Sequence, residues 1–332
     1  MLEYDLNKYE PLNKKIQKKQ ISIKDKFRDK YIILYLLLFI LMLSWKGKRY
    51  IVYKNSKVCL CSVAKEENRY VREFVEHYKK YGIDKIYIYD NNDINGEKFE
   101  DVINDYIKSG FVEIIDYHGV KQPQLPAYND CYKRFNSQYG WLIFYDIDEF
   151  IYLKDFTSFK TFLNDERFYD CNRVQLNWIF YTDNNQLYYE DKPLKERFTE
   201  REPNARGKKK GKDQGIKSVV RGNLTKLVID CPHTLSEKTR SCDGFGNRRK
   251  KTSIVMKEAD FEYYYIKHYA CKSTEEFIQQ KLIRTDVYHK IDNNMEKINW
   301  YLLYNRVTKE KIDLIEKRTK YNLSIFYDRI EK

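Results

Sequence analysis

Four short apolar runs, separated by amphipathic segments, constrain the fold of this chain most strongly. Each run has the length of a buried strand, and the segments between the runs place apolar residues at helical spacing. We expect strands over residues 57–64, 85–89, 111–115 and 141–145, and helices over 69–81, 97–108 and 122–138. Strands that alternate with helices at this spacing indicate βαβ units. The sequence therefore predicts an α/β fold, Rossmann-like, with a mostly parallel central sheet flanked by helices.

The fourth predicted strand runs directly into acidic residues. Residues 141–145 are apolar or aromatic, and Asp146, Ile147, Asp148 and Glu149 follow. Since residues i and i+2 of a strand point the same way, Asp146 and Asp148 present two carboxylates to one point. The two carboxylates repel each other unless a cation lies between them. A divalent ion that also binds diphosphate oxygens would satisfy it; a solvated acidic turn is the alternative.

Polar residues also follow the first two predicted strands. Lys65 and Glu66 come after the first, and Asp90 and Asn91 after the second. Parallel sheets bind ligands outside the carboxyl ends of their strands, so these residues and the acidic motif should share one edge. No Gly-x-Gly-x-x-Gly follows the first strand and no Gly-Lys-Ser/Thr loop is present, which argues against a dinucleotide redox site and a P-loop. These features favour a metal ion that holds a nucleotide diphosphate.

The basic charge of the chain is concentrated in three segments. The formal net charge is +13. Residues 1–57 contain 14 basic and 5 acidic residues, and 201–213 and 240–251 each add a surplus of four, which leaves −4 for the remainder. Because the expected core is mildly acidic, nucleic acid is not the predicted partner.

Seven cysteines are scattered along the chain. Cys59 and Cys61 are too close in sequence for an unstrained disulfide within a strand, and no Cys-x-x-Cys pair suggests a zinc–thiolate site. We expect buried thiols, with room for one disulfide in the C-terminal half.

The N-terminal region predicts a membrane anchor. Residues 1–30 are polar and basic, and residues 31–45 are apolar except for Ser44. A helix of this length covers about 22 Å, short of the ~30 Å hydrocarbon core, although flanking lysines and aromatic residues reduce the gap. An uncleaved signal anchor is our interpretation, and a buried core helix is the alternative. The basic residues before it favour a lumenal main domain, which the sequons at Asn223 and Asn322 allow.

Several motifs, in the same order, resemble GT-A glycosyltransferases of family 92 and the related family 2-like type. The matching stretches are 62–68, 73–78, 82–83, 88–91, 146–150, 266–269 and 272–277. The resemblance covers about residues 57–285. The chain departs from it at Asn91-Asn92-Asp93, where relatives often carry serine, and at Tyr181, where glycine is expected. Both departures concern the donor sugar rather than the fold.

The resemblance implies a GT-A fold and a metal-dependent transferase. Its donor would be a nucleotide sugar, expected to be UDP-linked, and its acceptor a hydroxyl of a glycan or glycoprotein. Mn²⁺ (or Mg²⁺) would be bound by Asp148 and His268, with Asp146 near the metal or the ribose. The residues expected to contact the nucleotide are Lys65, Glu66, Asp90, Asn91, Asp146 and Lys217, with Arg221 as a further phosphate candidate. The alternative is that these are solvated loop residues and that His268 is a core or surface histidine.

An inverting reaction, which the resemblance also implies, needs a carboxylate to deprotonate the acceptor. Asp183, Glu190 and Asp243 are the candidates, and the sequence does not choose among them. Trp178, Phe180 and Tyr181 could stack on a sugar or lie in the core. The basic, Gly-containing stretch 199–215 is either a lid over the phosphates or a solvated loop.

The predicted organisation has five parts. They are a tail (1–30), an anchor (31–46), a stem (47–56), the transferase domain (57–290) and C-terminal helices packed on it (291–332). We expect a single-pass type II protein facing the Golgi or ER lumen, with its oligomeric state open. Two alternatives remain: a sugar nucleotidyltransferase, although its Gly-rich basic loop is missing, and a non-catalytic glycan-binding or membrane-scaffold protein.

Overall fold

The computed structural model describes most of the chain after residue 57. The described residues are 30–42, 57–201, 215–224, 227–231, 233, 240–249, 260–284 and 294–330. The chain divides into two compact units, Met1–Asn55 and Ser56–Lys332. The C-terminal helices belong to the same unit as the sheet.

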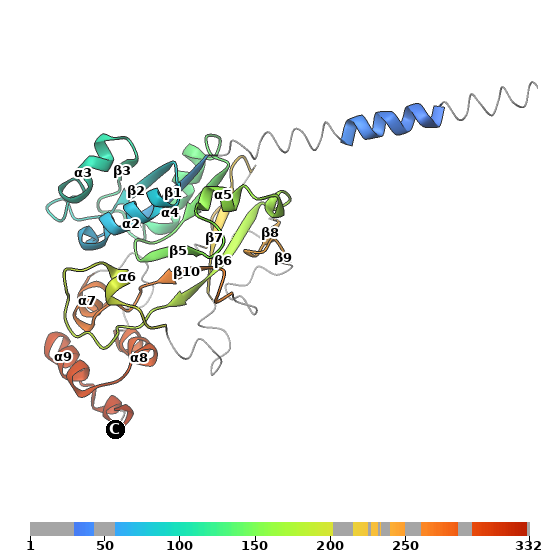
Figure 1. The fold of residues 1–332 in the computed structure, drawn as a ribbon. Coiled ribbons are helices and arrows are strands. Elements are labelled where there is room, and N and C mark those ends of the chain that lie inside the picture. Colours follow the sequence, from blue (N-terminus) through green and yellow to red (C-terminus); the bar gives the residue numbers. More distant parts are fainter. Residues whose placement is uncertain are drawn as a thin grey trace, which may run out of the picture. The chain divides into compact units, whose positions relative to one another are not determined.

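The first unit contributes one described helix, over residues 30–42 (Figure 1). Its side chains are exposed, and Tyr35 reaches 79%. Thirteen residues extend about 20 Å. Within the described part of the chain, no helix combines the length and the apolar character needed to cross a bilayer. The predicted anchor over 31–46 is therefore not supported, and the predicted stem (47–56) and nearly all of the tail lie outside the described residues.

The second unit begins with the predicted alternation of strands and helices. The strands are β1 (Val58–Ala64), β2 (Lys85–Asp90), β3 (Val112–Asp116) and β4 (Trp141–Phe144), and the helices are α2 (Asn68–Lys80), α3 (Glu100–Lys108) and α4 (Gln124–Phe135). These strands pair in the order β3-β2-β1-β4 and are all parallel, as expected. Gly82 ends the turn after α2 at φ +75°, a conformation that favours glycine. The α/β fold is confirmed.

The other half of the sheet is mixed, which corrects the expectation of a mostly parallel sheet. Its strands are β5 (Glu149–Leu153), β6 (Arg173–Phe180), β7 (Ile216–Arg221), β8 (Ser241–Cys242), β9 (Arg248–Arg249) and β10 (Tyr264–His268). The main order continues as β4-β7-β6-β10-β5. β7 is antiparallel to both β4 and β6, and β5 is antiparallel to β10. Because β7 runs in the opposite direction, its first residues lie at the edge where β4 and β6 end.

The apolar residues of β1 alternate between two cores. Val58 and Leu60 pack in the same cluster as Phe74 and Tyr78 of α2. Cys59 and Cys61 pack on the other face, with the residues of α4. The sheet is thus covered on both faces, which explains why all seven residues of β1 are buried.

Two disulfides join segments of the second unit. Cys171–Cys242 lies in the C-terminal half, as the sequence allowed, and Cys61–Cys131, which was not expected, links β1 to α4. Cys59 and Cys271 are buried and lie outside these two disulfides.

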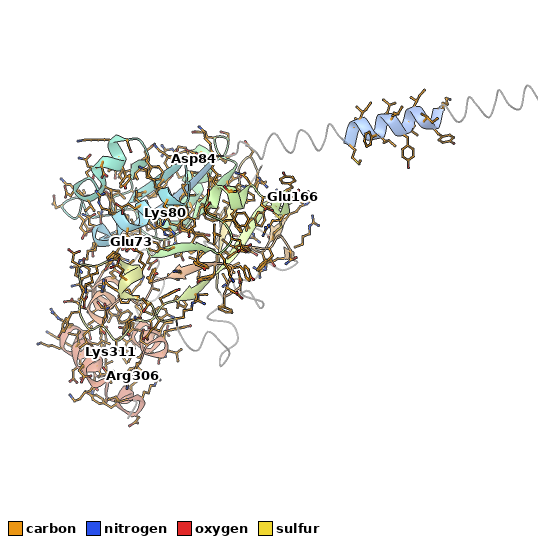
Figure 2. All side chains as sticks on the ribbon, in the orientation of Figure 1. Glu73, Lys80, Asp84, Glu166, Arg306 and Lys311 are labelled. Atoms are coloured by element: carbon orange, nitrogen blue, oxygen red, sulfur yellow. A yellow bond between two sulfur atoms is a disulfide. The ribbon has the colours of Figure 1, made fainter. Side chains whose placement is uncertain are left out.

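Short helices gather at one end of the second unit (Figure 1). They are α6 (Leu194–Arg197), α7 (Thr274–Phe277), a π-helix (Ile278–Ile283), α8 (Asn294–Tyr304) and α9 (Lys309–Thr319), whereas α5 (Phe159–Leu163) lies apart from them, on the side of β7 and β8. Glu73 of α2 accepts the backbone N–H of Leu194 at the start of α6, at 2.7 Å. Figure 2 labels Glu73 near this group, and Lys311 with Arg306 inside it. The predicted amphipathic helices beyond residue 290 are confirmed as α8 and α9, whose apolar faces share a core cluster with Phe180.

Candidate functional site

The predicted rim of polar residues exists at the carboxyl ends of the parallel strands. Ala64, at the end of β1, pairs with Asp90 at the end of β2. His268, at the end of β10, pairs with Phe180 at the end of β6 and with Glu149 at the start of β5. The acidic motif follows β4 at the same edge. The sheet therefore brings side chains from distant parts of the chain to one place.

The carboxylate of Asp146 is held by three donors. Lys217 Nζ lies 2.7 Å from Oδ2, while Gln124 Nε2 and the Tyr128 hydroxyl donate to Oδ1 at 3.0 and 3.1 Å. Burial would raise the pKa of Asp146, but the charge of Lys217 outweighs it and the net pKa is lowered. Burial opposes the charge on Lys217, yet Asp146 and Glu149 raise its pKa well above the ordinary value. Asp146 and Lys217, both predicted nucleotide contacts, are thus bonded to each other.

Glu149 completes this buried cluster. Its side chain is fully buried, its Oε2 lies 3.3 Å from Lys217 Nζ, and the same oxygen accepts the backbone N–H of Asp146 at 3.1 Å. Burial raises the pKa of Glu149 to about 7, although Lys217 acts in the opposite direction. The second oxygen, Oε1, is buried and has no hydrogen-bond partner among the described residues.

Asp148 and His268 form a second, adjacent pair. Asp148 Oδ1 lies 3.5 Å from His268 Nε2, and the two side chains are 11% and 14% exposed. Burial would raise the pKa of Asp148, but the charge and hydrogen bond of His268 lower it well below the ordinary value. His268 Nδ1 is buried, has no hydrogen-bond partner within the described part of the chain, and lies 3.9 Å from Glu149 Oε1.

Of the three predicted metal ligands, two are thus in contact, and the third, Asp146, is engaged by Lys217. In the part of the chain that the structure describes, no group of three His, Cys, Asp or Glu side chains is arranged as a metal site.

A cleft of about 380 Å³ opens beside the ends of β2 and β3. It is lined by Asp90, Ile94, Glu97, Lys98, Glu100, Ile114, Asp116 and His118. His118 Nε2 lies 3.6 Å from Asp90 Oδ2, and its Nδ1 lies 2.6 Å from Asp116 Oδ1. Burial raises the pKa of Asp90. Asp116 and His118 were not predicted. They follow the third predicted strand, so the reasoning applied to the polar residues after the first two strands would have found them.

The remaining predicted nucleotide contacts lie beside Asp90. Lys65 Nζ pairs with Asp93 at 3.0 Å. Glu66 is exposed, at φ +53°, and its backbone N–H donates to Asn92 Oδ1 at 2.7 Å. The amide of Asn91 donates to the carbonyl oxygen of Tyr117 at 2.7 Å, so this side chain holds the segment after β3. The rim therefore contains all four predicted residues, with Asn91 already bonded within the protein.

The three candidate bases have partners other than Asp148 and His268. Asp183 is buried, and its Oδ2 lies 2.7 Å from both Lys311 Nζ and the Tyr301 hydroxyl. Glu190 is exposed and pairs with Lys192 at 2.9 Å.

Asp243 lies in the turn between β8 and β9, where its carboxylate accepts backbone N–H groups of Phe245 and Asn247. β8 pairs with the first residues of β6, at the opposite edge of the sheet. Arg221, at the far end of β7, pairs with Trp141 at that opposite edge too.

Aromatic rings surround His268. Phe180 stacks on its imidazole with centroids 4.9 Å apart, and Trp178 contacts it edge-on at 5.3 Å. Trp300 of α8 contacts Phe180 at 5.7 Å. Trp178 also contacts His233, with ring centroids 5.0 Å apart, and His233 was not predicted from the sequence. Residues 202–214 of the predicted lid lie outside the described residues.

Comparison with known proteins gives a family match over most of the chain. The profile of Glycosyltransferase family 92 matches residues 54–317. A glycosyltransferase family 92 protein of Oryza sativa subsp. japonica is 27% identical over 99 residues, which is 30% of this chain and 17% of the relative. One from Ricinus communis is 26% identical over 100 residues, 30% of this chain and 18% of the relative. The aligned part thus spans less than a fifth of these curated relatives.

Solved structures give only weak similarity. S. aureus TarS 1-349 in complex with UDP has a TM-score of 0.35 at 12% identity, covering 83% of this chain and 75% of that chain. The complex of the same protein with UDP-GlcNAc has a TM-score of 0.29 at 11% identity, covering 40% and 37%. Scores below 0.5 do not establish a shared fold.

Proposed function

The chain belongs to glycosyltransferase family 92, and on that premise we propose that its second unit transfers a sugar from a nucleotide-sugar donor to a hydroxyl of a glycan or glycoprotein. The observation that carries the proposal is the Asp148–His268 pair, at 3.5 Å, on the same sheet edge as the cleft at Asp90. A nucleotide bound along this edge would place its base at the cleft and its diphosphate at the pair. This is the arrangement expected of a GT-A fold.

The cleft is better suited to bind the nucleobase of the donor than its phosphates. Asp90, Asp116, Glu97 and Glu100 make its lining acidic, which disfavours phosphate oxygens. A carboxylate can accept a hydrogen bond from an imide N–H, such as that of uracil. We therefore propose a UDP-linked donor, with Asp90 as the acceptor for the base. Lys65 and Glu66 would approach the nucleotide from the end of β1, while Asn91 would support the cleft from behind.

A divalent ion fits Asp148 and His268. Both side chains are largely buried, and Mn²⁺ accepts a mixed imidazole and carboxylate ligand set better than Mg²⁺ does. The unpaired Nδ1 of His268 faces the unpaired Oε1 of Glu149, and a carboxylate behind an imidazole commonly orients a metal-binding histidine. When bound, the ion would supply Lewis-acid stabilisation of the negative charge on the departing diphosphate.

Lys217 has a separate role in this proposal. It neutralises Asp146 and Glu149 at 2.7 and 3.3 Å. Without it, the buried Glu149 and the partly exposed Asp146 would lie beside Asp148 with no lysine to offset their charges, which disfavours ionisation of all three. Lys217 therefore holds the ionised carboxylate of Asp146 in place, where it can contact the ribose. Asp148 then remains available to bind the ion.

We also propose an inverting reaction and an oxidising compartment. In an inverting transfer the acceptor oxygen attacks the anomeric carbon from the face opposite the diphosphate. The disulfides Cys61–Cys131 and Cys171–Cys242 support a location such as the ER or Golgi lumen, since disulfides persist in oxidising compartments.

The deciding experiment measures nucleotide release by the full chain from a panel of UDP- and GDP-sugars, with Mn²⁺, Mg²⁺ or EDTA. We expect release from a UDP-sugar that requires the metal and is abolished in Asp148→Asn. Asp105→Asn, a change on the exposed face of α3 beside Arg72, is the matched control and should retain release. UDP binding with Mn²⁺ is measured in parallel by calorimetry. If the chain neither binds UDP nor releases any nucleotide with Mn²⁺ present, the proposal is overturned.

A further inference from the structure

His233 is held in a defined orientation beside the candidate site. Its Nδ1 lies 3.1 Å from the carbonyl oxygen of Ile216, the residue before Lys217. Because a carbonyl oxygen can only accept, Nδ1 carries the proton. Nε2 of the neutral ring then keeps its lone pair, the form in which histidine accepts a proton. Nε2 has no hydrogen-bond partner among the described residues.

The surroundings of His233 keep it neutral. Burial and then the charge of Lys217 lower the pKa of His233 to about 4, while the charge of Asp146 acts in the opposite direction. His268 is the third charged or titratable group that acts on it, and also disfavours its protonation. At neutral pH the imidazole is therefore a free base. Edge-on contact with Trp178 at 5.0 Å fixes the plane of the ring.

His233 is linked to the candidate site through Trp178 and Ile216. Trp178 contacts both histidines, with ring centroids 5.0 Å from His233 and 5.3 Å from His268. Ile216, which binds Nδ1, is adjacent to the lysine that holds Asp146. His233 therefore lies close to the residues at which the donor is proposed to bind.

The acidic residues at this edge already have other partners. Asp146 and Glu149 share Lys217, and Asp148 pairs with His268. The carboxylate of Asp183 is bonded to Lys311 and Tyr301 inside the C-terminal core. Among these described acidic residues, none is free of a partner, which leaves His233 as the candidate proton acceptor.

We propose that His233 is the catalytic base of the transfer. This inference rests on the proposed function. The acceptor O–H bond breaks and its proton passes to Nε2 of His233, while the acceptor oxygen forms a bond to the anomeric carbon. The bond from that carbon to the diphosphate oxygen breaks, and its electron pair leaves with the nucleoside diphosphate. The imidazolium then returns the proton to solvent. Water in place of the acceptor gives donor hydrolysis by the same steps.

Three forms of the full chain test this assignment: wild type, His233→Ala and His233→Asn. Asparagine keeps an N–H that can donate to the Ile216 carbonyl but has no nitrogen that accepts a proton. The readouts are the rate of UDP release from the UDP-sugar that the wild type hydrolyses, with Mn²⁺, and the Kd for UDP. Both variants should release UDP about 10²–10⁴-fold more slowly. Their Kd should remain within about threefold of wild type, and their thermal unfolding should show a native fold.

Chemical rescue separates a base from a structural residue. Free imidazole should restore part of the rate of His233→Ala, in proportion to its neutral form, because the side-chain deletion leaves room for it. Variant rates close to wild type would overturn the assignment, and so would a slow His233→Ala that imidazole does not rescue. If the wild type itself neither binds UDP nor hydrolyses a donor, the proposed function has failed and this inference with it. An active wild type with unaffected variants would reject the role of His233 alone.

Discussion

His268 Nδ1 and Glu149 Oε1 face each other across 3.9 Å inside the protein, and neither has a hydrogen-bond partner within the described residues. An unsatisfied buried polar group costs about 1–3 kcal/mol of folding stability, so a hydrogen bond between these two atoms would stabilise the protein. A movement of less than an ångström would let Nδ1–H donate to the carboxylate. Binding a cation at Nε2 favours that movement, because the carboxylate then stabilises the imidazole that holds the cation.

Replacing Glu149 by Gln should weaken cation binding. The amide has no charge to support His268, so we expect the Kd for Mn²⁺, measured by calorimetry in the presence of UDP, to rise about 10–100-fold. Glu76→Gln, on the exposed face of α2, provides the control and should bind Mn²⁺ like wild type. Unchanged Mn²⁺ affinity in Glu149→Gln would remove Glu149 from the cation site.

Replacing Lys217 by Met should destabilise the fold. The change leaves Asp146 and Glu149 without their shared cation in a buried site, and breaking a buried pair in this way costs about 3–5 kcal/mol. Urea unfolding measures the loss. Lys192→Met breaks the exposed pair with Glu190 and should change the free energy of unfolding little. Equal losses of stability in the two variants would show that Lys217 does not stabilise the fold by pairing with Asp146 and Glu149.

The C-terminal helices should depend on one buried lysine. Lys311 of α9 is buried, with its Nζ 2.7 Å from Asp183 Oδ2 and 2.7 Å from the carbonyl oxygen of Arg306 (Figure 2). Lys311→Met should lower the free energy of unfolding by about 3–5 kcal/mol, since Asp183 remains buried and charged. Lys309→Met removes an exposed pair on the same helix and should change it little. Hydrogen exchange in α8 and α9 should increase only in the first variant.

Stability should fall on the acidic side of neutrality because of His77. Its Nε2–H donates to the carbonyl oxygen of Ile151 at 3.1 Å, and burial lowers its pKa to about 3. The unfolded chain binds the proton near pH 6.5, so acid favours unfolding. The contribution is complete above about pH 6.5 and declines as the pH falls toward 3, by up to about 1.4 kcal/mol per pH unit. Urea midpoints between pH 4 and 8 should show a flatter profile for His77→Gln; an unchanged slope would assign the acid effect to other groups.

The two halves of the sheet differ in how far their elements could be predicted from the sequence. In the first half, each strand, helix and turn was predictable, because apolar periodicity and Gly82 act over a few residues. In the second half, β5 gave no comparable signal, and the antiparallel insertion of β7 was not foreseen. Strand direction there depends on long connections whose paths local patterns do not set.

The sequence alone determined that acidic residues would follow the carboxyl end of a buried strand, because an apolar run leads directly into Asp146 and Asp148. Their predicted alternation on one strand face was wrong, since β4 ends at Phe144 and both residues lie in the turn before β5. Only the tertiary structure decided their different partners. Lys217, 71 residues later in the chain, lies against Asp146, whereas His268 lies against Asp148. That division follows from β7 entering beside β4 and β10 pairing with β5. Pairing between distant strands is fixed by the packing of the whole sheet, and no local sequence pattern contains it.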